Sequence, residues 1–266
     1  MTLGHQPLVV AHRGSSLAEP EHSLAAYQRA IAEGADALEC DVRLTRDGHL
    51  VLLHDRRISR VSNGRRTVSA SRRDELECFD YSRGHIGDSD DDGPAGHRTS
   101  AGFDPRRSLL TLERLLTEAE GHHVALSIET KHPTRHGGRV ETALIDLLER
   151  RGWLASAQVP RLRLMSFSHL AVRRFHASAP AIPAVFLIER MLPWHRDGSL
   201  PRGATTAGPS IDIVRRDPGY VARVHERGGE VHVWTVDSDA DIDLCLNLGV
   251  DAIISNRPGH VRRRLG

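Results

Sequence analysis

The beginning of the chain alternates a strand, a helix and a second strand. Pro7–Ala11 is a short apolar run, and His22–Glu33 carries apolar residues at helical spacing until Gly34 ends the pattern. Ala37–Val42 is the next apolar run. Polar side chains follow these runs. Strand–helix–strand units with polar groups at the C-terminal ends of the strands are typical of a parallel α/β barrel.

The rest of the chain continues this alternation. A tight-turn pair, Asp47-Gly48, precedes a third short strand at His49–Leu53. Apolar runs, most of them separated by helical patterns, predict six further strands: Val124–Ile128, Arg163–Phe167, Pro183–Ile188, Ser210–Val214, Glu230–Val236 and Val250–Ile254. Together with Pro7–Ala11 and Ala37–Val42, these six supply the eight strands that closure requires. We therefore expect an α/β fold, a (β/α)8 barrel of the TIM type, closed by pairing of the first strand with the last.

The length of the chain fits one such domain. A chain of 266 residues suits a single α/β barrel, which typically has ~250 residues, so we expect one domain over residues 1–266. Residues 56–107 are rich in Arg, Ser, Asp and Gly and have few apolar runs. This composition predicts a small insertion after the third strand. Helical patterning resumes at Leu109–Leu116, with Thr111 as the expected N-terminal cap.

Five chemically active side chains lie in the first part of the chain. His12 and His54 each follow an apolar run, and a pair of histidines can act as general base and general acid because imidazole titrates near neutral pH. Arg13 can hold a phosphate through its planar guanidinium. Glu39 and Asp41 share one face of their strand, because side chains alternate along a strand, and carboxylate oxygens bind hard divalent cations. Together these groups can cleave a phosphodiester.

A further acidic and basic pair follows the strand predicted at Val124–Ile128. Glu129 and Lys131 are two residues apart, so they share a face and point into the barrel mouth. Lys131 is the only lysine among 36 basic residues, which indicates a need for a compact ammonium beside a phosphate oxygen or a developing alkoxide. Trp234 lies near the end of the strand Glu230–Val236, where it can form a wall of the substrate site.

Each of these residues also has a purely structural interpretation. The two histidines could be buried residues of the core. Glu39 and Asp41 could form an ion-paired acidic face, although charges on a strand buried on both sides need partners or a cation. Lys131 could be a chance ion-pair partner of Glu129, and Trp234 could be plain core.

The motifs that hold these residues resemble those of the glycerophosphodiester phosphodiesterase family over nearly the whole chain. They are residues 11–55, LSIETK at 126–131, LMSFS at 164–168, VHVWTVD at 231–237 and GVDAIISNRP at 249–258. The resemblance implies a (β/α)8 barrel with His12 and His54 as acid and base. It also implies that Glu39, Asp41 and Glu129 are the metal ligands.

The chain departs from the family pattern at one visible point. Where the family usually has Pro-Glu-Asn-Thr, this chain has Pro20-Glu21-His22-Ser23. Ser23 keeps a hydroxyl near the helix start, but His22 replaces the amide. The resemblance therefore does not extend to substrate contacts made by that amide, whereas the catalytic set is unchanged.

The expected reaction is metal-dependent hydrolysis of a small-molecule glycerophosphodiester to an alcohol and glycerol 3-phosphate. Either water or the glycerol 2-hydroxyl could attack, with His12 assigned as base and His54 as acid. The expected cofactor is one divalent cation, Mg2+ or Ca2+ with Mn2+ as a third option, because three carboxylates suit all of them. Two alternatives remain: a lysophospholipase D-type phosphodiesterase, which an exposed apolar patch beside the mouth would favour, and a non-catalytic anion-binding barrel. The leaving alcohol and the oligomeric state stay open.

Composition argues against several other classes of protein. The net charge is +1, so overall charge predicts no nucleic-acid partner. Three scattered cysteines form neither a disulfide framework nor a CxxC metal site. The sequence shows no signal peptide and no apolar run of the ~20 residues that span a membrane. We therefore expect a cytoplasmic enzyme without stable membrane insertion.

Overall fold

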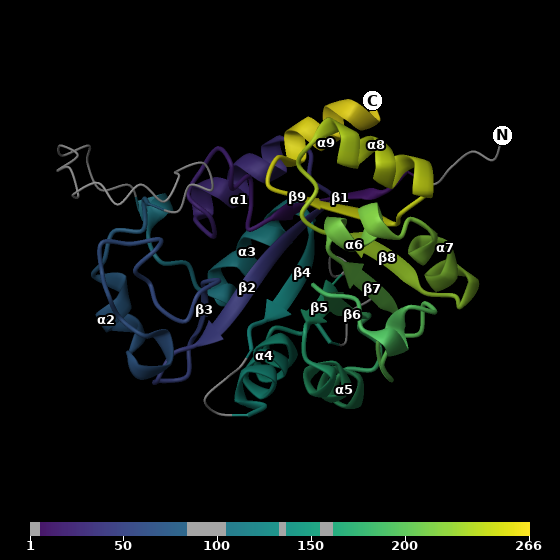
Figure 1. Cartoon of the computed structure of the whole chain (residues 1–266). Coiled ribbons are helices and arrows are strands. Elements are labelled where there is room, and N and C mark those ends of the chain that lie inside the picture. Colours follow the sequence, from purple (N-terminus) through teal and green to yellow (C-terminus); the bar gives the residue numbers. More distant parts are fainter. Residues whose placement is uncertain (1–5, 84–104, 133–136, 155–161) are drawn as a thin grey trace.

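The fold is a closed barrel of parallel strands surrounded by helices (Figure 1). The structure, a computed structural model, describes residues 6–83, 105–132, 137–154 and 162–266. Within these residues the barrel strands are β1 Leu8–His12, β2 Ala37–Leu44, β4 Ala125–Thr130, β5 Leu162–Ser166, β6 Ala184–Ile188, β7 Thr206–Pro209, β8 Glu230–Val233 and β9 Ala252–Ser255. The strand β1 pairs with β2 on one side and with β9 on the other, which closes the barrel. The expected fold class and the pairing of the first and last strands are confirmed.

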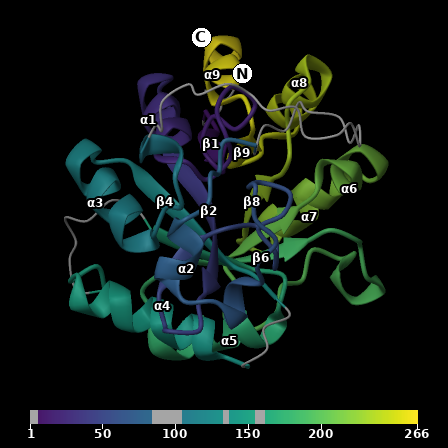
Figure 2. The ribbon, with the colours of Figure 1, turned by 90° about the vertical axis from the view of Figure 1, so that its left-hand side faces the viewer.

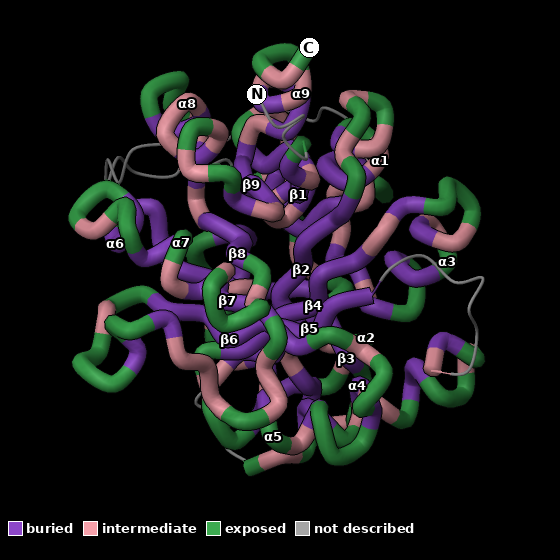
Figure 3. The backbone as a smooth tube through the Cα atoms, turned by 90° about the vertical axis from the view of Figure 1, so that its right-hand side faces the viewer, coloured by how far each residue is buried: buried purple, intermediate pink, exposed green. Residues whose placement is uncertain are grey.

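Helices cover the outside of the barrel. In chain order they are α1 Leu24–Ala32, α3 Leu112–His122, α4 Arg139–Arg150, α5 His169–Ser178, α6 Ile211–Arg216, α7 Gly219–Glu226, α8 Asp239–Leu248 and α9 Pro258–Leu265. Figure 3 shows buried strands at the centre and exposed residues on the outer sides of these helices. Ser23, Thr111, Ser168 and Ser238 each cap a helix by accepting from the backbone N–H three residues on. The cap predicted at Thr111 is confirmed.

The third strand of the chain, β3 Leu50–Leu52, lies beside the barrel rather than in its wall. It pairs antiparallel with the end of β2, so that Val42 lies opposite Leu52. The turn at Asp47-Gly48 connects the two strands, and Gly48 has φ +87°, a conformation that glycine adopts without strain. Because β2 continues beyond the barrel before this turn, β3 brings the chain back to the barrel mouth.

The segment after β3 forms a small subdomain at that mouth. It contains η1 Val68–Ala70, α2 Arg73–Glu77 and η2 Pro105–Arg107. Ile58, Leu76 and Tyr81 pack in its own apolar cluster against Val51 and Leu53 of the barrel side. In Figure 2 the blue segment around α2 lies in front of the barrel strands. Residues 84–104 of the expected insertion lie outside the described residues.

The strand predicted at Ser210–Val214 is wrong. Ile211–Arg216 forms helix α6, and the barrel strand is the preceding segment, Thr206–Pro209. The β-branched residues of 210–214 favour a strand by local propensity. The barrel nevertheless uses the segment with small residues, because its neighbour packs closely: a Cβ on Gly208 would lie 2.7 Å from the side chain of Leu187. Tertiary packing therefore overrides the local preference.

Side-chain alternation separates the inside of the barrel from its outside. Leu38, Cys40 and Val42 pack outward in the apolar layer beneath the helices, so Glu39 and Asp41 face inward. Below the mouth the interior is filled by Val10, Met165, Val185, Leu187 and Ile254. Among the described residues, no helix has both the length and the apolarity needed to cross a membrane.

Candidate active site

Three carboxylates converge inside the mouth of the barrel. Glu39 and Asp41 lie on the inward face of β2, and Glu129 on β4 is the register partner of Asp41. All three side chains are buried, and one oxygen from each lies within 4.8 Å of the other two. A compact set of oxygen donors matches the ligands of a hard divalent cation.

The charges of this cluster repel one another. Burial raises the pKa of Glu39 and of Glu129, the charge of Asp41 raises both further, and the pKa of Glu129 reaches about 8. Burial acts in the same direction on Asp41, but the charges of Lys131 and Arg13 outweigh it and hold the pKa of Asp41 well below its ordinary value. A bound cation would favour the charged form of every carboxylate in the cluster.

Two basic side chains touch the cluster from different sides. Lys131 Nζ lies 2.8 Å from Glu129 Oε1 and 3.3 Å from Asp41 Oδ1. Arg13 Nε lies 3.1 Å from Asp41 Oδ2, and the Arg13 backbone N–H donates to Glu39 Oε2 at 3.0 Å. Burial lowers the pKa of Lys131, but Asp41 and Glu129 raise it overall. The ammonium therefore stays charged at the cluster.

A hydrogen-bond network fixes which nitrogen of His12 carries a proton. Asn256 Nδ2 donates to Asp237 Oδ2 at 2.7 Å, which leaves Asn256 Oδ1 facing His12 Nδ1, also 2.7 Å away. Because Oδ1 only accepts, the proton is assigned to Nδ1, and Nε2 is free to accept one. Burial, then the charge of Arg13, lower the pKa of His12 to about 3. His12 is thus neutral near pH 7, as a general base must be.

His54 reaches the mouth from β3. The backbone N–H of Leu53 donates to the carbonyl oxygen of Asp41 at 3.0 Å, so the next residue, His54, lies beside the end of β2. His54 Nδ1 lies 2.7 Å from Asp55 Oδ1, and Arg60 Nε donates to Asp55 Oδ2 at 2.7 Å. Because an ionised carboxylate only accepts, Nδ1 of His54 carries a proton. Asp55 therefore orients the ring of His54.

Arg60 links the insertion to the carboxylate cluster. Its Nη1 and Nη2 donate to the two carboxylate oxygens of Glu21 at 2.9 and 2.6 Å, and Arg13 Nη1 donates to Glu21 Oε2 at 3.2 Å. An ion-paired chain therefore runs from Asp55 through Arg60, Glu21 and Arg13 to Asp41. His54, through Asp55, and the carboxylate cluster are therefore held in one network.

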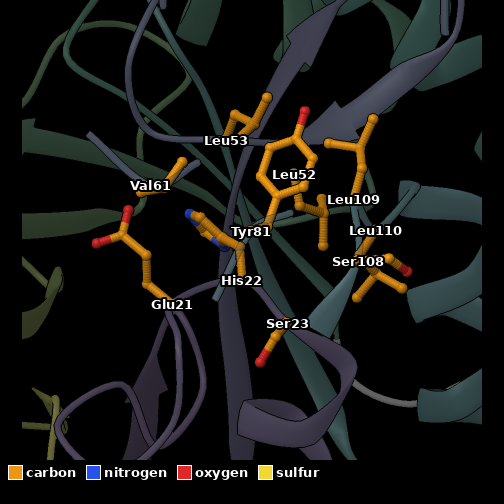
Figure 4. A pocket seen from close by; sticks show the side chains of 10 residues that line it. All are labelled: Glu21, His22, Ser23, Leu52, Leu53, Val61, Tyr81, Ser108, Leu109 and Leu110. Carbon is orange, nitrogen blue, oxygen red and sulfur yellow. The ribbon is translucent and has the colours of Figure 1, made fainter. Parts of the chain in front are cut away.

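A small pocket lies beside this chain, between the barrel and the insertion (Figure 4). The carboxylate of Glu21 and the imidazole of His22 line one part of this pocket. The remaining lining is mainly apolar: Ser23, Leu52, Leu53, Val61, Tyr81, Ser108, Leu109 and Leu110. The carboxylate cluster does not line it. His22 Nε2 lies 2.9 Å from Asp41 Oδ2, so His22 is the contact between this pocket and the cluster.

Trp234 and Phe167 form an aromatic wall at the mouth. Trp234 Nε1 donates to the carbonyl oxygen of Gly208 at 2.7 Å, and the ring of Phe167 meets it edge-on with centroids 5.5 Å apart. Lys131 Nζ lies 5.8 Å from the centroid of Phe167. These contacts place Trp234 on the side of the mouth next to Lys131.

Of the residues that the sequence singled out, Arg13 and Lys131 contact the three carboxylates directly. The structure also adds residues that the sequence analysis missed. Asn256, Asp237 and Phe167 lie inside the quoted motifs, but nothing in the sequence shows which side chains they contact. His22 was visible only as a departure from the family pattern. Arg60 lies in the arginine-rich insertion, where nothing in the sequence separates it from its neighbours.

Comparison with known proteins agrees with this geometry. The profile of the Glycerophosphoryl diester phosphodiesterase family matches residues 12–260. A Mycobacterium tuberculosis relative, named probable glycerophosphodiester phosphodiesterase 1, is 43% identical over 263 residues, 97% of this chain and 92% of the relative. A glycerophosphodiester phosphodiesterase from Caldanaerobacter subterraneus is 30% identical over 254 residues, 94% of each chain.

Solved structures share the barrel. A phosphodiesterase from Oleispira antarctica, in complex with the product sn-glycerol-3-phosphate, has a TM-score of 0.81 at 22% identity, over 97% of this chain and 96% of that chain. This likeness shows the fold. Because the family profile spans nearly the whole chain and two relatives share 30% and 43% identity with it, the chain belongs to the glycerophosphodiester phosphodiesterase family of phosphoric diester hydrolases.

Proposed function

We propose that this enzyme hydrolyses a glycerophosphodiester to an alcohol and glycerol 3-phosphate with one divalent cation. The observation that carries the proposal is the convergence of Glu39, Asp41 and Glu129 beside His12, in a mouth that also holds two basic side chains. The names of the relatives and the glycerol 3-phosphate bound to the Oleispira antarctica phosphodiesterase support the substrate class.

The residues present fit a hard cation. The three donors are buried carboxylates, and only two positively charged side chains, Arg13 and Lys131, contact them among the described residues. Mg2+ or Ca2+ suits such a set, with Mn2+ as a third option. When bound, the cation supplies Lewis-acid polarisation of the phosphoryl oxygens.

The side chains divide the proton transfers between them. His12, with Nε2 unprotonated, takes a proton from the attacking group, which is water or the glycerol 2-hydroxyl. His54 donates the proton on Nε2 to the leaving alkoxide, and Asp55 stabilises the charged ring before that transfer. Arg13 and Lys131 bind phosphoryl oxygens and offset the negative charge that develops in the transition state.

Removal of metal tests this proposal directly. The purified protein is treated with excess chelator, and release of glycerol 3-phosphate is measured with choline, ethanolamine, inositol and glycerol diesters. We expect no turnover in chelator and restored turnover on addition of Mg2+, Ca2+ or Mn2+. Full activity in excess chelator, with no metal in the purified protein, would refute the proposed cofactor.

An exposed apolar patch beside the mouth favours a second candidate, a lysophospholipase D-type activity on monoacyl glycerophosphodiesters. The patch consists of Phe167, Leu170, Leu192 and Trp194, of which Leu170 is 58% and Trp194 61% exposed. The rings of His169, at the start of α5, and His195, in the 3-10 helix Pro193–His195, have centroids 5.3 Å apart and connect the two segments of the patch. Because Phe167 also lies 5.8 Å from Lys131 Nζ, an acyl chain on a glycerol bound at the mouth can extend over the patch.

Matched substrates separate the two candidates. Glycerophosphocholine and lysophosphatidylcholine are compared for the wild type, Trp194→Ala and Leu170→Ser. We expect the variants to lose turnover of the lysophospholipid and to keep turnover of the short diester, while Trp194→Phe, which keeps an apolar ring, retains both. A wild type without activity on the lysophospholipid would exclude this candidate.

A further inference from the structure

Two side chains beneath Asp41 have no part in the reaction described above. His22 and Tyr27 are buried, with 4% and 0% of their surface exposed. His22 Nε2 lies 2.9 Å from Asp41 Oδ2, and His22 Nδ1 lies 2.8 Å from the hydroxyl of Tyr27. The Tyr27 hydroxyl also lies 3.2 Å from the carbonyl oxygen of Glu39. The imidazole therefore bridges helix α1 and a carboxylate of the cluster.

The chemistry of the partners gives this bridge a direction. Asp41 has an ionised carboxylate that only accepts, so the proton of the neutral imidazole is assigned to Nε2. The Nδ1 atom is then an acceptor, and the single proton of the Tyr27 hydroxyl is shared between Nδ1, 2.8 Å away, and the carbonyl oxygen of Glu39, 3.2 Å away. The relay runs from Tyr27 O–H to Nδ1 of His22, and from Nε2–H of His22 to Oδ2 of Asp41.

The relay determines which oxygen of Asp41 can face a cation. Asp41 Oδ2 is engaged by His22 Nε2 and by Arg13 Nε at 2.9 and 3.1 Å. The other oxygen, Asp41 Oδ1, lies 3.3 Å from Lys131 Nζ and faces β4. Because Oδ2 accepts the hydrogen bond from His22 Nε2, the carboxylate cannot rotate without breaking a buried hydrogen bond, which is costly.

The backbone at His22 is specialised for this contact. His22 has φ +60°, in the left-handed region where asparagine, aspartate and histidine are the most enriched residues after glycine. Its N–H donates to the carbonyl oxygen of Arg13 at 3.0 Å, so the loop is tied to the residue that follows His12. An asparagine here suits the backbone, but its side chain ends about one bond short of the position of Nε2.

We infer that His22 and Tyr27 are positioning residues that orient Asp41 toward the cation and thereby set the metal affinity of this enzyme. The inference rests on the proposed metal site. Partners that hydrogen-bond to metal ligands typically change metal affinity ~10–100-fold when they are removed. Tyr27 acts on Asp41 through His22, so its effect depends on the imidazole being present.

Manganese binding to protein stripped of metal, measured by electron paramagnetic resonance without substrate, tests the inference. We expect His22→Asn, which keeps a residue suited to the left-handed backbone, to raise the Kd for Mn2+ by ~10–100-fold. Tyr27→Phe should raise the Kd by a smaller factor, because the contact of His22 with Asp41 remains. The double variant should match His22→Asn alone.

Tyr220→Phe is the matched control. Tyr220 is as fully buried as Tyr27, but its hydroxyl has no hydrogen-bond partner among the described residues, so the Kd for Mn2+ should not change. A purely structural role of the relay would lower the melting temperature and leave the Kd unchanged at temperatures far below melting; that result overturns the inference. Tyr27→Phe, which removes one oxygen, tests the relay even if His22→Asn does not fold. A wild type that binds no Mn2+ would instead refute the proposed metal site itself.

Discussion

Replacing Glu21 by glutamine removes a negative charge from between two arginines. The Glu21 side chain is 1% exposed and lies 2.6 Å from Arg60 Nη2 and 3.2 Å from Arg13 Nη1. Burial raises the pKa of Glu21, but the hydrogen bonds from Arg60 and the charge of Arg13 lower it to about 2. The variant therefore leaves two guanidinium groups facing a neutral amide in a buried place.

The pKa gives the size and the sign of the effect. The pKa of Glu21 is about 2 in the folded protein and 4.5 in the absence of the fold. This difference means that the ionised side chain contributes about 3 kcal/mol to the free energy of unfolding. Because the folded pKa is below the unfolded one, this stabilisation is complete above the unfolded value and is lost as the pH falls toward 2. By pH 3 about 2 kcal/mol of it is gone.

Urea denaturation of the wild type and Glu21→Gln at pH 7 and pH 3 measures this difference. We expect the variant to have a free energy of unfolding about 3 kcal/mol lower at pH 7, and the gap to shrink by about 2 kcal/mol at pH 3. Glu113→Gln, an exposed glutamate on α3, is the control and should change little at either pH. An equal gap at both pH values would refute the assignment of Glu21 as a buried charge held by Arg60 and Arg13.

His12→Ala and His54→Ala should each lower turnover by ~10²–10⁴-fold with the circular dichroism spectrum unchanged, and the double variant should lose far less than the product of the singles. Near-normal turnover of either single variant would make that histidine structural. Lys131→Arg should lower kcat strongly and change KM less, because a wider guanidinium cannot occupy the place of an ammonium 2.8 Å from Glu129. Wild-type values of kcat and KM would show that any positive charge at position 131 is sufficient. Glu129→Gln should raise the metal concentration that gives half-maximal activity, with Glu113→Gln unchanged, and equal metal requirements would exclude Glu129 as a ligand.

Local rules were sufficient for much of the fold and for the composition of the cluster. Side chains alternate along a strand, so the sequence alone predicts that Glu39 and Asp41 share a face, and the structure confirms it. The cap at Thr111 is equally local, because its hydroxyl accepts from an N–H only three residues away. Repeated strand–helix units led to the barrel for the same reason: each unit carries its own periodicity.

The arrangement of the site depends on contacts between distant segments, which no local pattern contains. The tautomer of His12 is set by Asn256, 244 residues further along the chain. The relay to Asp41 forms only when α1 packs against β2. The sequence alone therefore shows His22 only as a residue that replaces the asparagine of the family pattern. Arg60 gains its importance from its ion pair with Glu21, 39 residues earlier in the chain.

The sequence by itself determined the repeated strand–helix pattern, the inward carboxylates and the set of candidate catalytic groups, because these follow from periodicity and residue chemistry. Only the tertiary structure decided which segment forms the seventh strand of the chain. The β-branched run at Ser210–Val214 has the better strand propensity, yet the barrel takes Thr206–Pro209, where Gly208 allows the side chain of Leu187 to approach. Closing a barrel constrains the distance between neighbouring strands, and that constraint outweighs the ~1 kcal/mol range of strand propensities.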